Sequence, residues 1–306
     1  MLNGLINIYK EPGFTSHDVV EKLRGIIKQK QIGHTGTLDP NAEGVLLVCL
    51  GKATKLFDML VGDTKTYEVV LLLGVTTDTQ DVGGNIRERR PVFCTEEDVR
   101  RCLKTFLGEQ HQIPPMYSAL KQNGKKLYEM AREGKEVERV ARPVHFYEIT
   151  VMKIDLPRVW LRATCSKGTY IRTFCHDIGE ALGCGGCMEH LIRTKVGTFE
   201  WKNTFKLHQV KFLADQGRLE DCILPIDKMF NSLPALQVEP QGNKLAWNGG
   251  YLYPQQIRGS ENPPNWTDGS DYRVYDSKRV FVGIYRYEAK KSYFRLIKMF
   301  YDGKAG

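Results

Sequence analysis

Short strand-like runs of hydrophobic residues alternate along this chain with amphipathic stretches that have helical spacing. The apolar run Val45–Leu50 is typical of a strand that is buried on both faces. Further strands are expected at Tyr67–Leu73 and Val159–Cys165, and helices at Ser16–Lys28, Glu96–Leu107 and Thr173–Leu182. Because strands and helices are mixed along the chain, the pattern predicts an α+β fold.

The composition changes after Phe230, where a segment rich in glycine, proline and aromatic residues begins. Three strand-like runs follow, Tyr272–Tyr275, Arg279–Glu288 and Ser292–Phe300, and the short segment Ala289–Lys291 forms a turn between the last two. These runs predict a small β-barrel. We therefore expect two domains, residues 1–232 and residues 233–306.

The charge of the chain favours a polyanionic partner. The formal net charge is +8 over 306 residues, and neutralisation of phosphates supplies much of the affinity of proteins for nucleic acids. Residues 1–8 lack the charged flank and long apolar region of a signal peptide, and no apolar run approaches about 18 residues. We therefore expect a soluble protein with a cytoplasmic location and no membrane contact.

Eight cysteines raise the question of disulfides or a metal. Most of them lie in apolar stretches, and reduced, partly buried thiols are the expected state. Cys184 and Cys187 have the spacing of half a zinc site, with Cys175 and His176 nearby. Because no second pair completes the pattern, we expect no metal, and zinc remains the alternative.

The segment Gly33–Gly44 presents one carboxylate, Asp39, on a polar turn just before the apolar run Val45–Leu50. Glycines on both sides permit unusual backbone angles, and Pro40 disfavours the helical conformation for Asp39. An acid on such a rigid loop suits catalysis. The alternative is ordinary turn chemistry, in which the aspartate accepts a backbone N–H two residues further on.

Six segments of the chain, in order, resemble motifs of the TruB family of tRNA pseudouridine synthases. Gly33–Gly44 is similar to the family's catalytic pattern G-H-x-G-x-L-D-P-x-A-x-G. The other segments are Tyr9–Ser16, Lys65–Glu68 with Leu73–Asp81, Gln112–Lys121, Lys167–Thr173 and His190–Phe199. The resemblance implies the pseudouridine synthase fold, a mostly antiparallel mixed sheet flanked by helices, followed by a C-terminal PUA-like RNA-binding domain.

A basic stretch within the first domain is a candidate RNA contact. Residues 116–142 contain seven lysines and arginines interspersed with four glutamates. On residue types alone, this pattern also fits a solvated helix face with mixed charges. The resemblance implies an insertion that clamps the stem-loop of the RNA.

The resemblance also implies roles for individual residues. Asp39 is the catalytic nucleophile or base, and Tyr67 stacks on the flipped base and handles a proton through its hydroxyl. A guanidinium from Arg172 would pair with Asp39 and orient it. The other expected contacts are Tyr170 and Leu191 in the substrate pocket, His34 near the flipped base, and Lys10 and Arg193 on phosphate or in shaping the cleft.

Together these features predict isomerisation of uridine to pseudouridine at position 55 in the T-loop of tRNA. The expected enzyme is a monomer that needs no cofactor and no protein partner. One rival is a non-catalytic RNA-binding or RNA-folding protein on the same scaffold. Another is an N-glycosidase that releases the base, which commonly needs a second catalytic carboxylate. Glu43 is the only nearby acid, and we interpret it as a loop residue.

Overall fold

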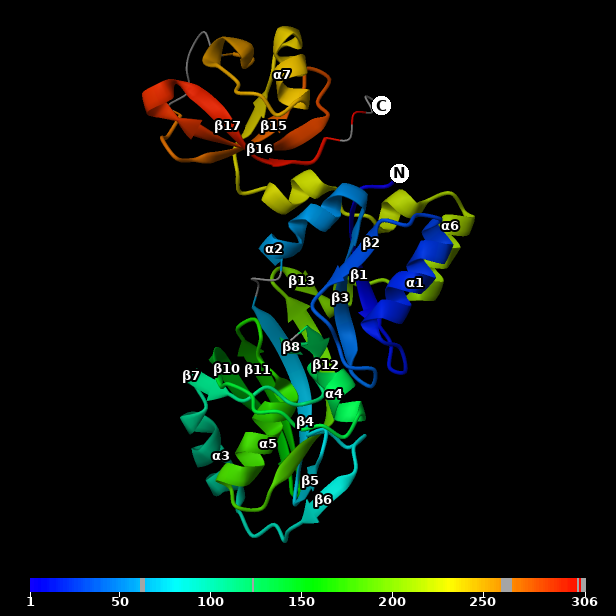
Figure 1. Ribbon diagram of the computed structural model, residues 1–306, viewed down its shortest axis with the longest axis vertical. Helices are drawn as coiled ribbons and strands as arrows, with labels where there is room; N and C mark the ends of the chain where they lie inside the picture. Colours follow the sequence, from blue (N-terminus) through cyan, green and yellow to red (C-terminus); the bar gives the residue numbers. More distant parts are fainter. Residues whose placement is uncertain (61–63, 123, 260–265, 302, 304–306) are drawn as a thin grey trace.

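The computed structural model describes residues 1–306 except 61–63, 123, 260–265, 302 and 304–306. A large mixed sheet runs through the first two thirds of the chain, and a smaller sheet lies at one end of the molecule (Figure 1). The strands of the large sheet are β1 (Gly4–Lys10), β2 (Ile32–Thr35), β3 (Glu43–Leu50), β4 (Lys65–Leu73), β7 (Gly108–Gln112), β10 (Arg142–Asp155), β11 (Arg158–Cys165), β12 (Gly186–Val196) and β13 (Phe199–Glu200).

The large sheet has the order β1-β3-β12-β4-β11-β10-β7, with β2 beside β3 and β13 beside β12. All of these neighbours pair antiparallel except β12 and β3, which are parallel. The mostly antiparallel mixed sheet predicted from the sequence is therefore confirmed. Its central strands β4 and β12 place residues from distant parts of the chain side by side.

Helices flank the large sheet in two groups (Figure 1). The helices are α1 (Ser16–Ile27), α2 (Phe57–Leu60), α3 (Glu96–Thr105), α4 (Leu127–Arg132), α5 (Ile171–Ala181), α6 (Leu207–Asp215) and α7 (Asn243–Trp247). Helices α3 and α5 pack on β4, β10 and β11 in the main core, whereas α1 and α6 pack on β1 and β3. None of the helices in the described part of the chain has both the length and the apolar character needed to span a bilayer.

Helices α1 and α3 begin where the sequence predicts. Thr15 caps α1 and Thr95 caps α3, and each exchanges hydrogen bonds with an aspartate three residues later, Asp18 and Asp98. Such capping boxes satisfy backbone N–H groups that have no partner within the helix. The start of α1 is thereby fixed next to the loop that follows β2.

The C-terminal strands form an open sheet. Its order is β14-β15-β16-β17, with β14 (Ala235–Gln237), β15 (Asp271–Tyr275), β16 (Phe281–Glu288) and β17 (Tyr293–Met299). The three predicted strands are confirmed, but no closed sheet is found among the described residues, so the predicted barrel is not. Strands β14 and β17 lie at opposite ends of this order, which leaves the sheet unclosed.

An apolar cluster joins the two sheets. It contains Leu5 and Leu56 from the N-terminal part, Phe230 from the connecting segment, and Ile284 and Phe300 from the C-terminal part. Aromatic contacts of Phe230 with Phe281 and Phe300 reinforce it, at centroid distances of 6.3 and 5.8 Å. Burial of this apolar surface ties the C-terminal sheet to the rest of the molecule.

The basic stretch at residues 116–142 is only partly helical. It contains the short strands β8 (Lys121–Gln122) and β9 (Lys125–Lys126) as well as helix α4, and residue 123 lies outside the described part. Lysine and glutamate side chains pair within it, Lys125 and Lys135 both contacting Glu133. The alternative of a single solvated helix face does not fit this segment, because the paired strands β8 and β9 precede helix α4.

Candidate active site

The loop between β2 and β3 presents Asp39 at the edge of the sheet. Leu38, the preceding residue, is buried in the main core, and its backbone N–H donates to the Ser16 hydroxyl at 2.9 Å. The turn is closed by the Ala42 N–H, which donates to the backbone carbonyl of Asp39 at 3.1 Å. The loop is thus fixed by backbone contacts, and the Asp39 carboxylate, with 37% of its side chain exposed, is free for other partners.

Arg172, in the first turn of α5, contacts both oxygens of the Asp39 carboxylate. Its Nε lies 2.9 Å from Oδ2 of Asp39, and its Nη2 donates to Oδ1 at 3.1 Å. The remaining donors of the guanidinium bind the backbone carbonyls of Thr79 and Tyr117, at 3.0 and 2.8 Å. A bidentate pair of this kind fixes the direction of the carboxylate. The contact between Arg172 and Asp39 that the sequence predicts is present.

A second carboxylate, Asp81, approaches the same guanidinium. Its Oδ2 lies 3.8 Å from Arg172 Nε, and its Oδ1 accepts hydrogen bonds from Thr79 and from the Gly83 N–H. The interpretation of Glu43 as the only nearby acid is therefore wrong. Glu43 accepts a hydrogen bond from the Tyr9 hydroxyl at 2.8 Å and pairs with His190 at 3.0 Å, so it has other partners.

Lys10 and Arg193 hold the loop from beneath and do not face outward. Lys10 has no exposed surface, and its ammonium donates to the carbonyls of Pro40 and Ala42. Burial lowers the pKa of Lys10 to about 8, although Asp39 opposes this shift. Of the two roles expected for these residues, cleft shaping fits their burial. Direct contact of Lys10 with phosphate does not, because the ammonium is covered by protein.

Arg193 spans both ends of the same loop. It is 1% exposed, and its guanidinium donates to the carbonyls of Gly36, Thr37 and Val45, at 3.0, 3.3 and 2.8 Å. These acceptors leave its guanidinium directed at backbone, so phosphate contact is not open to Arg193 either. Its place on β12, opposite Tyr67 on β4, connects the loop to the floor of the site.

Gly44 is required where the loop enters β3, because its φ is +107° and a Cβ there would lie 2.2 Å from the carbonyl oxygen of Arg193. We expect Gly44→Ala to lower the free energy of unfolding by at least about 2 kcal/mol, through strain and collision. Gly25→Ala is the control, since Gly25 is an exposed glycine of α1 with open space around it. That change should stabilise the protein by about 0.5–1 kcal/mol. Denaturant titration measures both, and equal effects would contradict the account.

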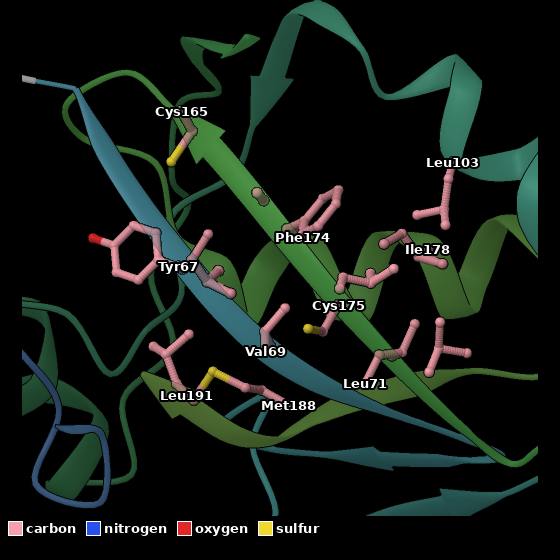
Figure 2. Packing of buried hydrophobic residues seen from close by; sticks show 14 of the residues in the cluster. Tyr67, Val69, Leu71, Leu103, Cys165, Phe174, Cys175, Ile178, Met188 and Leu191 are labelled. Atoms are coloured by element: carbon pink, nitrogen blue, oxygen red, sulfur yellow. The ribbon is translucent and has the colours of Figure 1, made fainter. Parts of the chain in front are cut away.

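Tyr67 and Leu191 form an apolar floor beside the loop. They are 7% and 6% exposed and belong to the same core cluster as Leu38. Figure 2 shows the two side chains at one end of this cluster, away from Leu103 and Ile178. Burial raises the pKa of the Tyr67 hydroxyl, while the Arg193 guanidinium opposes that shift. The hydroxyl is therefore protonated at neutral pH and available as a donor.

Tyr170 borders the site from the start of α5. The Gln112 side chain clamps its backbone, accepting from the Tyr170 N–H at 2.9 Å and donating to the Tyr170 carbonyl at 3.2 Å. The ring is half-buried, and burial raises the pKa of its hydroxyl. This clamp sets the position from which α5 presents Arg172.

His34, on β2, is half-buried and its Nδ1 has no hydrogen-bond partner among the described residues. Burial lowers the pKa of His34 below its ordinary value of 6.5, and Arg193 adds to the shift. The unfolded chain therefore takes up a proton at a higher pH than the folded protein does. We expect the free energy of unfolding to fall as the pH drops below 6.5, and His34→Gln to weaken that fall. Denaturant titrations between pH 5 and 8 measure it, and identical profiles would contradict the assignment.

The cysteines of the C-x₂-C pattern face different surroundings. Cys184 lines a hollow of about 540 Å³ together with Cys94 and Cys102. Cys187 is fully buried. Burial is the main cause that raises the pKa of the nearby Cys175 thiol, and Cys187 adds to this shift. Within the described ranges, no three histidine, cysteine or acidic side chains are grouped to hold a metal. The zinc alternative therefore has no converging ligands around this pair.

Four segments of the chain meet at Arg172. They carry Asp39, Thr79 with Asp81, Tyr117, and Arg172 itself. Sequence reasoning assigned no role to Thr79, Asp81, Tyr117 or the clamping Gln112. Each lies inside a segment that carries the resemblance to the TruB family, which is the signal that could have identified it.

Two family models match this chain. Residues 24–171 match the model described as TruB family pseudouridylate synthase (N terminal domain), and residues 172–231 match the tRNA pseudouridylate synthase B C-terminal domain. The chain is 48% identical to tRNA pseudouridine synthase B of Lachnoclostridium phytofermentans, over 98% of this chain and 100% of that protein. It is 41% identical to the protein of the same name from Alkaliphilus oremlandii, over 98% and 99%.

Solved structures with a similar fold come from protein and ribonucleoprotein complexes. A chain of a Cbf5-Nop10-Gar1 complex is 27% identical, with a TM-score of 0.69, and the match covers 97% of this chain and 85% of that one. A chain of an H/ACA RNP bound to a substrate RNA containing 2′-deoxyuridine is 25% identical, with a TM-score of 0.68 and coverage of 98% and 85%. The large sheet with its flanking helices is thus shared with these structures.

Proposed function

The chain belongs to the TruB family of pseudouridylate synthases, and from this premise we propose that it isomerises uridine 55 in the T-loop of tRNA, with Asp39 as nucleophile or base. The observation that carries the proposal is the two-pronged contact of Arg172 with the Asp39 carboxylate. This contact orients a partly exposed carboxylate on a loop that buried groups hold in place. An oriented carboxylate is the group this reaction needs.

The reaction rearranges one nucleotide without an outside reagent. The N1–C1′ bond breaks, the uracil turns while it stays bound, and C5 joins C1′. C5 then loses its proton and N1 gains one, so that the product is an isomer of the substrate. Asp39 either attacks the sugar or the base, or takes a proton from the ribose. Because a folded RNA loop hides these atoms, the nucleotide must first be flipped into the pocket.

Tyr67 and Leu191 supply the apolar contact for the flipped uracil in this proposal. This role is supported by their place in the same core cluster as Leu38, the residue that precedes Asp39 in the chain. Because the Tyr67 hydroxyl is protonated at neutral pH, it can transfer a proton near C5. Tyr170 and His34 complete the rim, and Lys10 and Arg193 act as positioning residues beneath the loop.

We also propose that residues 1–232 form the catalytic domain and residues 233–306 a PUA-like RNA-binding domain, with about 116–142 as the clamp on the T-arm. We propose further that the protein acts as a monomer without a protein partner. Lysines and arginines outnumber glutamates in the clamp by seven to four, which suits an RNA backbone.

Incubation of the protein with a tRNA transcript labelled at uridine tests the proposal against its rivals. Nuclease digestion and chromatography should reveal pseudouridine in catalytic excess over protein. Release of free uracil would instead favour an N-glycosidase, for which Asp81 is now the second nearby carboxylate. Tight binding without either product would favour the non-catalytic RNA-folding rival.

A further inference from the structure

Three tyrosines share the outward side of the C-terminal sheet. A bridge pairs Leu252 with Phe294 of β17, through backbone hydrogen bonds of 3.1 and 2.7 Å, and both of these side chains are fully buried. Side chains alternate between the two faces of extended backbone. Their neighbours Tyr251, Tyr253 and Tyr293 therefore point away from the core, and we call these three residues the tyrosine face.

The rings of the tyrosine face are in contact with one another and partly exposed to solvent, Tyr293 less than the other two. Tyr251 and Tyr253 are 49% and 41% exposed. The Tyr251 and Tyr293 rings lie 4.4 Å apart at 33°, and Tyr253 meets Tyr293 edge-on at 6.2 Å. By contrast, Tyr272 and Tyr285 of the same sheet are 5% and 0% exposed. Packing of the domain does not account for a partly exposed group of three aromatic rings.

Basic side chains border these rings. The Lys291 ammonium lies 5.6 Å from the centre of the Tyr293 ring, and Arg295 follows Tyr293 on the same side of β17. Glu288 pairs with both, at 3.5 Å from Lys291 and 2.7 Å from Arg295. Lys290 is also exposed, and the Asp268 carboxylate accepts from the Ala289 N–H of the same turn, so three cations stand against two acids in this local group. The surroundings of the tyrosine face are therefore positive.

We propose that the tyrosine face binds an unpaired stretch of the RNA substrate, one or more bases stacking on the rings and Lys291 and Arg295 contacting the adjoining phosphates. Exposed aromatic rings with neighbouring cations suit single-stranded RNA. Every base can stack on a ring, and every phosphate of the backbone carries a negative charge. A docking protein would need a broader apolar surface than three tyrosines ringed by lysines offer. The inference rests on the proposed function in taking RNA as the substrate, but it names a second contact, away from Asp39.

The test compares two RNAs, a full-length tRNA transcript and the isolated T-arm stem-loop, with the double variant Tyr251→Ala, Tyr293→Ala. Loss of stacking should weaken binding of the full-length transcript about 5- to 150-fold. Values of kcat/KM on the isolated T-arm should stay within about twofold, because its only unpaired segment, the T-loop, binds at the Asp39 site and the stretch proposed for the tyrosine face lies outside the T-arm. The double variant Tyr251→Phe, Tyr293→Phe keeps the rings and should restore binding to within about threefold.

Phe212→Ala serves as the control, since Phe212 is an aromatic residue of α6 with 60% exposure. It should leave both RNAs unaffected. Unchanged affinity of the alanine variant for the full-length transcript would overturn the inference, and so would an equal loss on the T-arm. Titration with a fluorescent single-stranded oligonucleotide and with its duplex keeps the test independent of turnover. Preference of the wild type for the single strand, lost in the alanine variant, supports the inference even if no pseudouridine forms.

Discussion

Replacing Asp39 with asparagine should reduce pseudouridine formation by several orders of magnitude while RNA binding persists. The amide has nearly the same shape as the carboxylate, but it can neither attack the nucleotide nor take a proton from it. Binding should hold to within about tenfold, because phosphate contacts dominate affinity for RNA. Single-turnover conversion of tRNA and a filter-binding titration measure the two effects separately.

Glu43→Gln is the matched control for this change. Glu43 also follows the loop closely and is 18% exposed, yet it bonds to Tyr9 and His190 instead of Arg172. We expect this variant to keep its rate to within about tenfold, as is usual for a residue outside the chemistry. Conversion by the Asp39 variant at more than a few per cent of the normal rate would show that another group performs the reaction.

Substitutions at Tyr67 should separate the contribution of its ring to binding from that of its hydroxyl to the rate. Tyr67→Phe keeps the stacking surface, so affinity should change little, but the rate should fall roughly 10²–10⁴-fold if the hydroxyl transfers a proton. Tyr67→Leu should lose the ring as well, weakening binding of the flipped base by about 1–3 kcal/mol. Rapid-quench rates and substrate titrations for both variants measure this division.

Stability must be measured beside these rates, because Tyr67 is 7% exposed within the main core. Thermal unfolding of both variants provides the control, and the leucine variant should lose about 1–3 kcal/mol. If both variants convert tRNA at near-normal rates, Tyr67 is a packing residue and the proposed proton transfer is wrong.

Local signals in the sequence predicted most of the elements that build the site. The apolar run Val45–Leu50 lies within β3, and the amphipathic stretch that begins at Ser16 is α1. The helix predicted from Thr173 is α5, which begins already at Ile171 and therefore includes Arg172. Each depends on contacts between near neighbours in the chain. The pairing of Asp39 with Arg172, 133 residues later, was expected only through the resemblance to a family.

The features that were missed depend on distant backbone. Lys10 and Arg193 were expected either on phosphate or in shaping the cleft, and the choice depends on the fold, which places the carbonyls of the Asp39 loop around them. Asp81 was not recognised because its approach to Arg172 requires the turn after the strand Val75–Thr77, which bridges Met188 of β12, to meet α5. In the C-terminal part, the strand pattern predicted the strands correctly, but the barrel inferred from them is not confirmed, since closure depends on how the edges β14 and β17 are placed.

The most direct test of the central claim is the state of uridine 55 in a tRNA transcript after incubation with the wild type or the Asp39→Asn variant. Carbodiimide treatment followed by primer extension marks pseudouridine as a stop in cDNA synthesis. We predict a strong stop for position 55 with the wild type and none with the variant. A stop elsewhere in the tRNA, no stop with the wild type, or equal stops with both proteins would contradict the claim.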